Sequence, residues 1–96
     1  MQEARRIVSE ALTIPTVHMN GTSRDNLVNP LREAYKALRI ALDKLAETAP
    51  NGRDYYPQGP DAINRAMDEY RSRQERLQSV QKELTDIAMA VQKAPK

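Results

Sequence analysis

The residues best suited to chemistry lie in one stretch of this 96-residue chain, residues 51–60, which reads Asn-Gly-Arg-Asp-Tyr-Tyr-Pro-Gln-Gly-Pro. Arginine is suited to bidentate contacts with phosphate. Tyrosine rings offer faces on which bases stack, and Gly52 and Gly59 allow a ligand to approach the backbone closely. A helix that begins after Gly59 would add N–H groups that attract anions. The stretch therefore predicts a loop that binds a phosphate-bearing ligand, such as a nucleotide. The alternative is a structural loop, in which the tyrosines plug the end of a helical bundle while Arg53 and Asp54 pair with each other.

A second polar segment precedes the first long helix and supplies His18, Asn20, Thr22 and Ser23. The helix between the two segments would separate them by roughly 39 Å, so one chain cannot bring them together. An antiparallel dimer can, and we expect a site shared between two chains. Its ligand-binding residues would be Asn51, Gly52, Arg53, Asp54, Tyr55, Tyr56 and Gln58 of one chain with His18, Asn20, Thr22 and Ser23 of the other. In this hypothesis Arg53 holds phosphate, the two tyrosines stack on a base, and Asn51 and His18 form hydrogen bonds.

Signs of catalysis or metal binding are weak. His18 is the only histidine, and nothing beside it resembles a hydrolytic triad. Glu83 and Asp86 have the spacing that all-helical nucleotide pyrophosphatases use to hold Mg²⁺. The matching pair on the other helix is missing, because Asp43 and Glu47 lie four residues apart and stand alone. We therefore expect no catalytic residue, no metal and no cofactor, with a nucleotide hydrolase as a minor alternative.

The composition bounds the class of protein. Fifteen basic and 13 acidic residues are interspersed, with a net charge of +2, so the chain lacks the broad basic field that nucleic-acid binding needs. No apolar run approaches the roughly 20 residues of a membrane span, and charged residues interrupt residues 1–12, unlike a signal peptide. The chain has no cysteine and is the size of one small domain. Small polar domains are marginally stable, so we expect a dimer or higher oligomer.

Apolar periodicity predicts the elements. Residues 2–12 should form a short amphipathic helix that docks on the rest of the molecule or on a partner chain. Residues 13–22 should be extended, with a turn at Asn20-Gly21. Residues 23–48 should form a helix capped by Thr22 or Ser23, residues 49–59 a loop, and residues 60–93 a long helix with Pro60 at its first position. Pro30 either kinks the middle helix or begins it, and a single kinked helix is the favoured interpretation.

Both long helices carry a seam of apolar residues at coiled-coil spacing. In the first the stripe is Leu27, Leu31, Ala34, Tyr35, Leu38, Ala41, Leu42 and Leu45. In the second the heptad positions are Ile63, Tyr70, Leu77, Leu84 and Val91, followed three residues later by Ala66, Val80 and Ile87, with Arg73 as the one polar break. A short loop makes the two helices antiparallel neighbours. The predicted fold is all-α: an antiparallel two-helix hairpin with a short N-terminal helix and an extended segment, assembling into an oligomeric helical bundle.

The motifs H-x-N-G-T-S at residues 18–23 and N-G-R-D-Y-Y-P-Q-G at residues 51–59 resemble those of a group of small helical proteins encoded in bacteriophage and prophage genomes. The resemblance covers roughly residues 14–92, whereas Pro30 and the first twelve residues are particular to this chain. It implies a phage accessory protein in a bacterial host cytoplasm and assigns no catalytic residue. The leading hypothesis is an accessory protein that binds and sequesters, without turnover, a small phosphate-bearing ligand such as a nucleotide signal of host immunity. The alternative is a protein-interaction module that inhibits a host protein or takes part in phage assembly.

Overall fold

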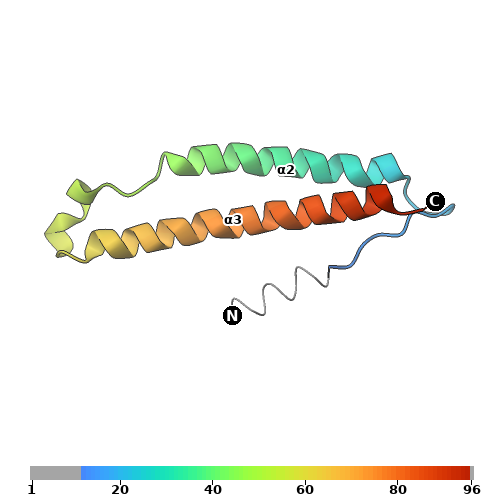
Figure 1. Ribbon diagram of the computed structural model, residues 1–96. Helices are drawn as coiled ribbons and strands as arrows, with labels where there is room; N and C mark the ends of the chain where they lie inside the picture. Colours follow the sequence, from blue (N-terminus) through green and yellow to red (C-terminus); the bar gives the residue numbers. More distant parts are fainter. Residues whose placement is uncertain (1–11, 96) are drawn as a thin grey trace.

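The computed structural model describes residues 12–95 and shows a helical hairpin (Figure 1). Helix α2 spans Arg24–Ala46 and helix α3 spans Ala62–Lys93, and the two run antiparallel side by side. The connection contains two 3-10 turns, η1 (Gly52–Asp54) and η2 (Tyr56–Gln58). No strand occurs within residues 12–95. The prediction of an all-α hairpin is therefore confirmed, and the helix predicted for residues 2–12 lies almost entirely outside the described residues.

Helix α2 begins where a side chain can cap it. The Ser23 hydroxyl accepts a hydrogen bond from the Asn26 backbone N–H at 3.2 Å, which satisfies one of the free donors of the first turn. Asp25 in that turn complements the positive end of the helix dipole. Of the two predicted caps, the structure uses Ser23. Pro30 lies inside a single helix, as favoured from the sequence.

The start of α3 and the turn before α2 differ from the prediction by one or two residues, and two short turns in the connection were not predicted. Helix α3 begins at Ala62, two residues later than expected, because Pro60 and Asp61 form a turn before it. The turn before α2 is closed by a hydrogen bond from the Gly21 N–H to the His18 carbonyl, so Met19 and Asn20 are its central residues. The two 3-10 turns of the connection were not predicted, because turns of three residues leave little periodicity to detect.

The main core cluster lies at the open end of the hairpin. Val17, Val28 and Val91 are buried there, and Val91 has no exposed surface. The extended segment before the turn therefore contributes to the core by closing over the ends of both helices. Ile14, Leu27, Ile87 and Ala88 pack against this cluster. A second buried group follows α3 toward the connection and comprises Ala62, Ala66 and Tyr70.

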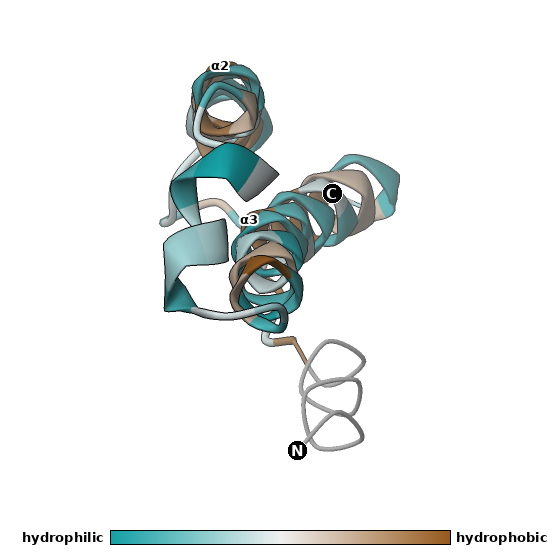
Figure 2. Cartoon of the chain, turned by 90° about the vertical axis from the view of Figure 1, so that its left-hand side faces the viewer, coloured by the Kyte–Doolittle hydropathy of each residue, from teal (hydrophilic) through white to brown (hydrophobic). Residues whose placement is uncertain are grey.

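The predicted seams are only partly buried. Tyr70 and Val91 are buried as expected, whereas Ala34 and Ala41 are exposed and Val80 is 44% exposed. The reason is the thinness of the molecule, whose shortest dimension of 16 Å is little more than the ~10–12 Å diameter of one helix. Two helices in a single layer cannot cover stripes this wide. Apolar residues on α2 accordingly gather on its side toward α3 (Figure 2).

Polar contacts between the helices come mainly from Arg24. Its Nη1 and Nη2 donate hydrogen bonds to the carbonyls of Gln92 and Ala94, at 2.8 and 2.7 Å. These carbonyls lie at the C-terminal end of α3, where backbone acceptors lack helical partners and a cation is favoured. The four ion pairs between described residues each join side chains three or four residues apart in sequence and are solvated, so each contributes little. Apolar packing and the Arg24 fork therefore hold the hairpin together.

A buried glutamine lies beside the apolar seam of α3. Gln81 is 8% exposed, and its Nε2 has no hydrogen-bond partner among the described residues. An unsatisfied buried amide costs about 1–3 kcal/mol. We expect Gln81→Met, which preserves the volume, to raise the free energy of unfolding by about 1 kcal/mol in urea titrations. Gln78→Met, at an exposed position of the same helix, should change stability by less than about 0.5 kcal/mol. A loss of stability in Gln81→Met would mean that the amide is satisfied in solution.

Neither described helix is long and apolar enough to cross a membrane. The oligomeric bundle predicted from the sequence stays a prediction, because the structure contains one chain.

Candidate functional site

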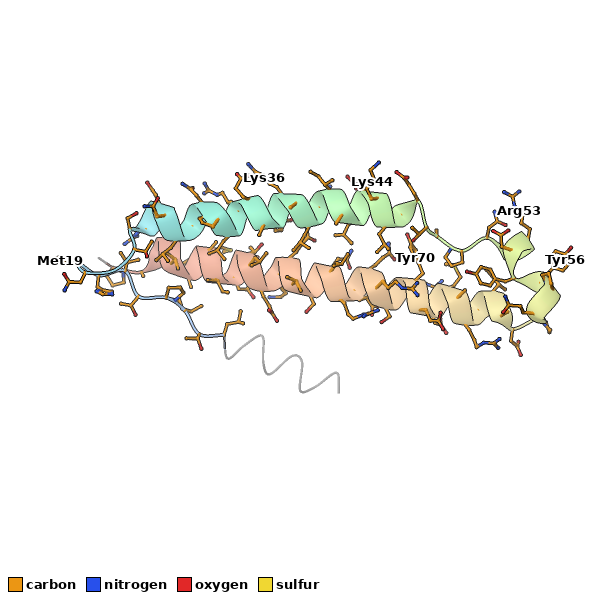
Figure 3. The ribbon with its side chains drawn as sticks, turned by 180° about the vertical axis from the view of Figure 1, so that it is seen from behind. Met19, Lys36, Lys44, Arg53, Tyr56 and Tyr70 are labelled. Carbon is orange, nitrogen blue, oxygen red and sulfur yellow. The ribbon has the colours of Figure 1, made fainter. Side chains whose placement is uncertain are left out.

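The structure places the two predicted polar segments at opposite tips of the hairpin. Figure 3 shows Met19 at one tip and Arg53 and Tyr56 at the other, with the length of the helices between them. Helix α2, at 23 residues, already spans about 35 Å. Within one chain the segments therefore cannot share a ligand, as the sequence indicated, and a site shared between chains stays a prediction.

The connection between the helices presents its polar side chains to solvent. Asn51 caps η1, because its Oδ1 accepts a hydrogen bond from the Arg53 backbone N–H at 3.1 Å. Arg53 and Asp54 are exposed and form no ion pair with each other or with another described residue. The local Arg53–Asp54 pair considered as an alternative is thus not seen. Tyr56 is 74% exposed, whereas Tyr55 is half-buried.

These positions determine what the connection can offer a ligand. The Arg53 guanidinium and the Tyr56 ring are both free to contact a ligand. Gly52 and Gln58 are exposed beside them. The oxygen of the Asn51 side chain is already used in the cap, which leaves its amide N–H₂ group as a donor. The polar side chains of the connection therefore lie on an exposed surface.

Gly59 allows the connection to enter α3. Its φ of 114° and ψ of 168° belong to a region that is essentially restricted to glycine. A Cβ there would meet no atom within 4 Å, so the cost of Gly59→Ala is backbone strain alone. We expect Gly59→Ala to lower the free energy of unfolding by about 1–3 kcal/mol, measured by urea denaturation. Gly52→Ala is the matched control, because Gly52 has neither a positive φ nor a neighbour within 4 Å. Equal effects of the two substitutions would contradict this origin of the cost.

The turn at the other tip holds His18 against Gly21. A Cβ on Gly21 would lie 2.5 Å from the His18 Nε2, so the imidazole packs directly over the glycine. His18, Gly21, Ser23 and Asp25 help to line a polar hollow of about 460 Å³ at this tip. The Ser23 hydroxyl is used in the helix cap, and Asn20 and Thr22 are exposed. The predicted residues of this segment are thus close together, with His18 exposed beside the start of α2.

An apolar hollow lies between the two helices, and we call it the groove. It has a volume of about 430 Å³ and runs along the first half of α2 and the last half of α3. Its floor is formed by Leu31, Tyr35, Leu84, Ala88 and Met89. Tyr35 and Met89 are 37% and 48% exposed, which leaves a substantial apolar surface open to solvent.

Charged residues edge the groove on one side. Arg32 and Lys36 of α2 line it there, while the facing residues of α3 are the uncharged Thr85 and Gln92. Arg32 has no ion-pair partner among the described residues, and Lys36 has one solvated partner, Glu33, at 3.4 Å. The groove therefore combines an apolar floor with one basic rim.

Sequence reasoning did not identify the groove. Leu31, Tyr35 and Leu84 were assigned to the seam between the helices, and Met89 was assigned to no stripe. Their exposure follows from the single-layer architecture, which periodicity does not reveal. A relevant signal was present, since Met89 lies five residues beyond Leu84 and so falls about 140° round the helix from it, on the flank of the seam.

No three His, Cys, Asp or Glu side chains within residues 12–95 gather closely enough to hold a metal ion. His18 is exposed at the tip and forms no side-chain hydrogen bond with a described residue. Comparisons of the chain with models of protein families, with curated proteins and with solved structures found no match.

Proposed function

We propose that this protein is a helical interaction module that binds an amphipathic helix of another protein in its groove. The observation that carries the proposal is the exposed apolar floor formed by Leu31, Tyr35, Leu84 and Met89 between two regular helices. Helix-in-groove recognition uses such a surface, on which residues at i, i+3, i+4 and i+7 of the bound helix serve as anchors.

The rim specifies the charge of the partner. Arg32 and Lys36 on one side favour a helix that carries Asp or Glu beside its apolar stripe, because complementary charges speed association and exclude wrong partners. The uncharged α3 side adds no competing acid, since Thr85 and Gln92 lie there. The partner class is therefore an acidic amphipathic helix.

A pair of designed peptides tests the proposal. Both carry the same leucine stripe on a 15-residue helix, and one has glutamate where the other has lysine on the flanks. Fluorescence anisotropy should show saturable binding of the acidic peptide, roughly tenfold tighter than that of the basic peptide, which corresponds to ~1.4 kcal/mol. Met89→Lys in the protein should abolish binding. Ile40→Lys, on the far side of α2, is the matched control and should leave it unchanged. Equal binding of both peptides, or binding that survives Met89→Lys, contradicts the proposal.

A second candidate function is the sequestration of a phosphate-bearing ligand, such as a nucleotide signal of host immunity, without turnover. Its support is the free Arg53 guanidinium next to the exposed Tyr56 ring, two groups that bind phosphate and stack on bases. A ligand that binds only the folded state raises the melting temperature. A panel of cyclic and linear nucleotides should therefore stabilise the protein, and Arg53→Ala should remove the effect. Silence of the whole panel rejects this candidate and leaves the groove as the functional surface.

A further inference from the structure

The side of α2 that faces away from α3 carries a pattern unlike an ordinary solvated surface. We call this the outer face of α2 and define it by Glu33, Ala37, Ile40, Ala41 and Lys44, all of which are exposed. Ile40 lies at its centre and is 63% exposed. The leucines of α2, by contrast, are half-buried toward α3. The outer face is also distinct from the groove, because Ile40 is five residues beyond Tyr35 and so about 140° further round the helix.

The charges of the outer face are arranged to complement a second copy of the same face. Glu33 precedes Ile40 by seven residues and Lys44 follows it by four. An antiparallel copy would place Glu33 beside Lys44 of the partner subunit, and Lys44 beside the partner's Glu33. A parallel copy would place like charges together, so the charge pattern selects the antiparallel arrangement.

Neither charge is strongly committed within its own chain. Glu33 pairs with Lys36 at 3.4 Å and Lys44 with Glu47 at 3.5 Å, and the side chains of both pairs are at least two-thirds exposed. Figure 3 shows Lys36 and Lys44 projecting on the side of α2 away from α3. Glu33 and Lys44 can therefore each form an ion pair across an interface without breaking a buried contact.

We propose that a second copy of this chain packs antiparallel on the outer face of α2, with Ile40 of each subunit in the contact. The two-fold axis would lie level with Leu38 and Arg39, midway between Glu33 and Lys44. This dimer leaves the apolar floor of both grooves open, because Leu31 and Tyr35 lie on another side of α2 from Ile40, although Lys36 of the rim adjoins the outer face. The inference is thus independent of the helix-binding function proposed above.

The same pairing aligns the two polar tips. Measured along α2 from the two-fold axis, Ser23 of the partner subunit would lie about 23 Å away. Ala46, the last residue of α2 in the first subunit, would lie about 11 Å from the two-fold axis in the same direction. Helix α3, at 32 residues, is nine residues longer than α2, at 23 residues, so the connection extends about 13 Å beyond Ala46. Ser23 of the partner subunit therefore falls level with the connection that carries Arg53, one helix spacing away.

This alignment makes each polar site a product of two chains. The connection of one subunit, with Arg53 and Tyr56, would face the turn of the other, with the partner's His18. The dimer has two such sites, related by the two-fold axis. This part of the inference rests on the second candidate function, whereas the dimer itself does not.

Engineered cysteines test the dimer, since the chain has none of its own. The double variant Glu33→Cys with Lys44→Cys should form disulfide-linked dimers on mild oxidation. The two positions lie 11 residues apart, about 17 Å along one helix, and so cannot join within a chain, because disulfides need Cα atoms within about 7 Å. The matched control, Arg32→Cys with Asp43→Cys, has the same spacing on another side of α2 and should form no disulfide-linked dimer. The proposal is overturned if the control cross-links as efficiently as the test pair.

Charge reversal provides an independent measurement. Glu33→Lys should weaken dimerisation roughly tenfold in sedimentation equilibrium at low salt, a loss of ~1.4 kcal/mol from two symmetric contacts. Adding Lys44→Glu should restore it, because the pair is rebuilt with its charges exchanged. Thermal melts serve to show that both variants are folded. A wild-type chain that stays monomeric at 100 µM overturns the dimer, while peptide binding in the groove would be unaffected.

Discussion

Val91→Asp should abolish cooperative folding of the hairpin. Val91 is the one large described side chain with no exposed surface, and it joins Val17 of the extended segment to Val28 of α2. An uncompensated charge at a buried position costs of order 3–5 kcal/mol, which is a large fraction of the stability of a small domain. Far-ultraviolet circular dichroism during urea titration should show a broad transition at low denaturant, or none.

The milder substitution Val91→Ala should lower the free energy of unfolding by about 2 kcal/mol, from the lost apolar burial and the cavity that remains. Val80→Asp is the matched control, a valine of the same helix that is 44% exposed. It should cost less than about 1 kcal/mol. Comparable losses at the two valines would mean that the cluster at the open end does not hold the hairpin together.

Arg24→Met should destabilise the same end of the molecule through the loss of hydrogen bonds. The substitution keeps most of the apolar stem but removes both hydrogen bonds to the carbonyls of Gln92 and Ala94. A hydrogen bond to a charged group contributes about 1.5–3 kcal/mol, and water replaces part of this at a partly exposed site. We expect a total loss of about 2 kcal/mol, together with faster amide hydrogen exchange in the last turn of α3.

Two further variants isolate the geometry of the Arg24 contact. Arg24→Lys should recover less than half of the loss, because an ammonium group lacks the planar fork that reaches two carbonyls at once. Arg39→Met should be neutral, since Arg39 is exposed and pairs with no described residue. Exchange in α3 that stays unchanged in Arg24→Met would argue that Arg24 does not tie the helix end in solution.

Self-association and partner binding would use different surfaces of this hairpin. The groove has an apolar floor and one basic rim, whereas the outer face of α2 pairs a central Ile40 with opposite charges at its two ends. A single layer of helices leaves both surfaces open at once. A dimer through one surface can therefore present two copies of the other, which would strengthen binding to a multivalent partner.

The amino-acid sequence by itself determined the hairpin. Apolar residues at helical spacing, Ser23 as a cap and glycines in the connection are local signals, and local signals suffice to define two helices and the loop between them. The separation of His18 from Arg53 followed from helix length alone. The sequence also pointed to Val91 as a seam residue, because it ends an unbroken run of heptad positions.

Only the tertiary structure decided which sides of the helices are covered. Val28 and Gln81 are buried although they lay outside the predicted stripes, whereas Ala34, Ala41 and Val80 lay inside them and are exposed. Periodicity defines the direction of an apolar face but not how much of it a neighbour can cover, and here one neighbouring helix covers only a narrow strip. For the same reason the groove and the reach of Arg24 to the end of α3, 68 to 70 residues away in sequence, could not be predicted from local patterns. The connection at residues 51–60 lies at one tip of the hairpin, where Arg53 and Tyr56 are exposed because no part of α2 or α3 extends over them.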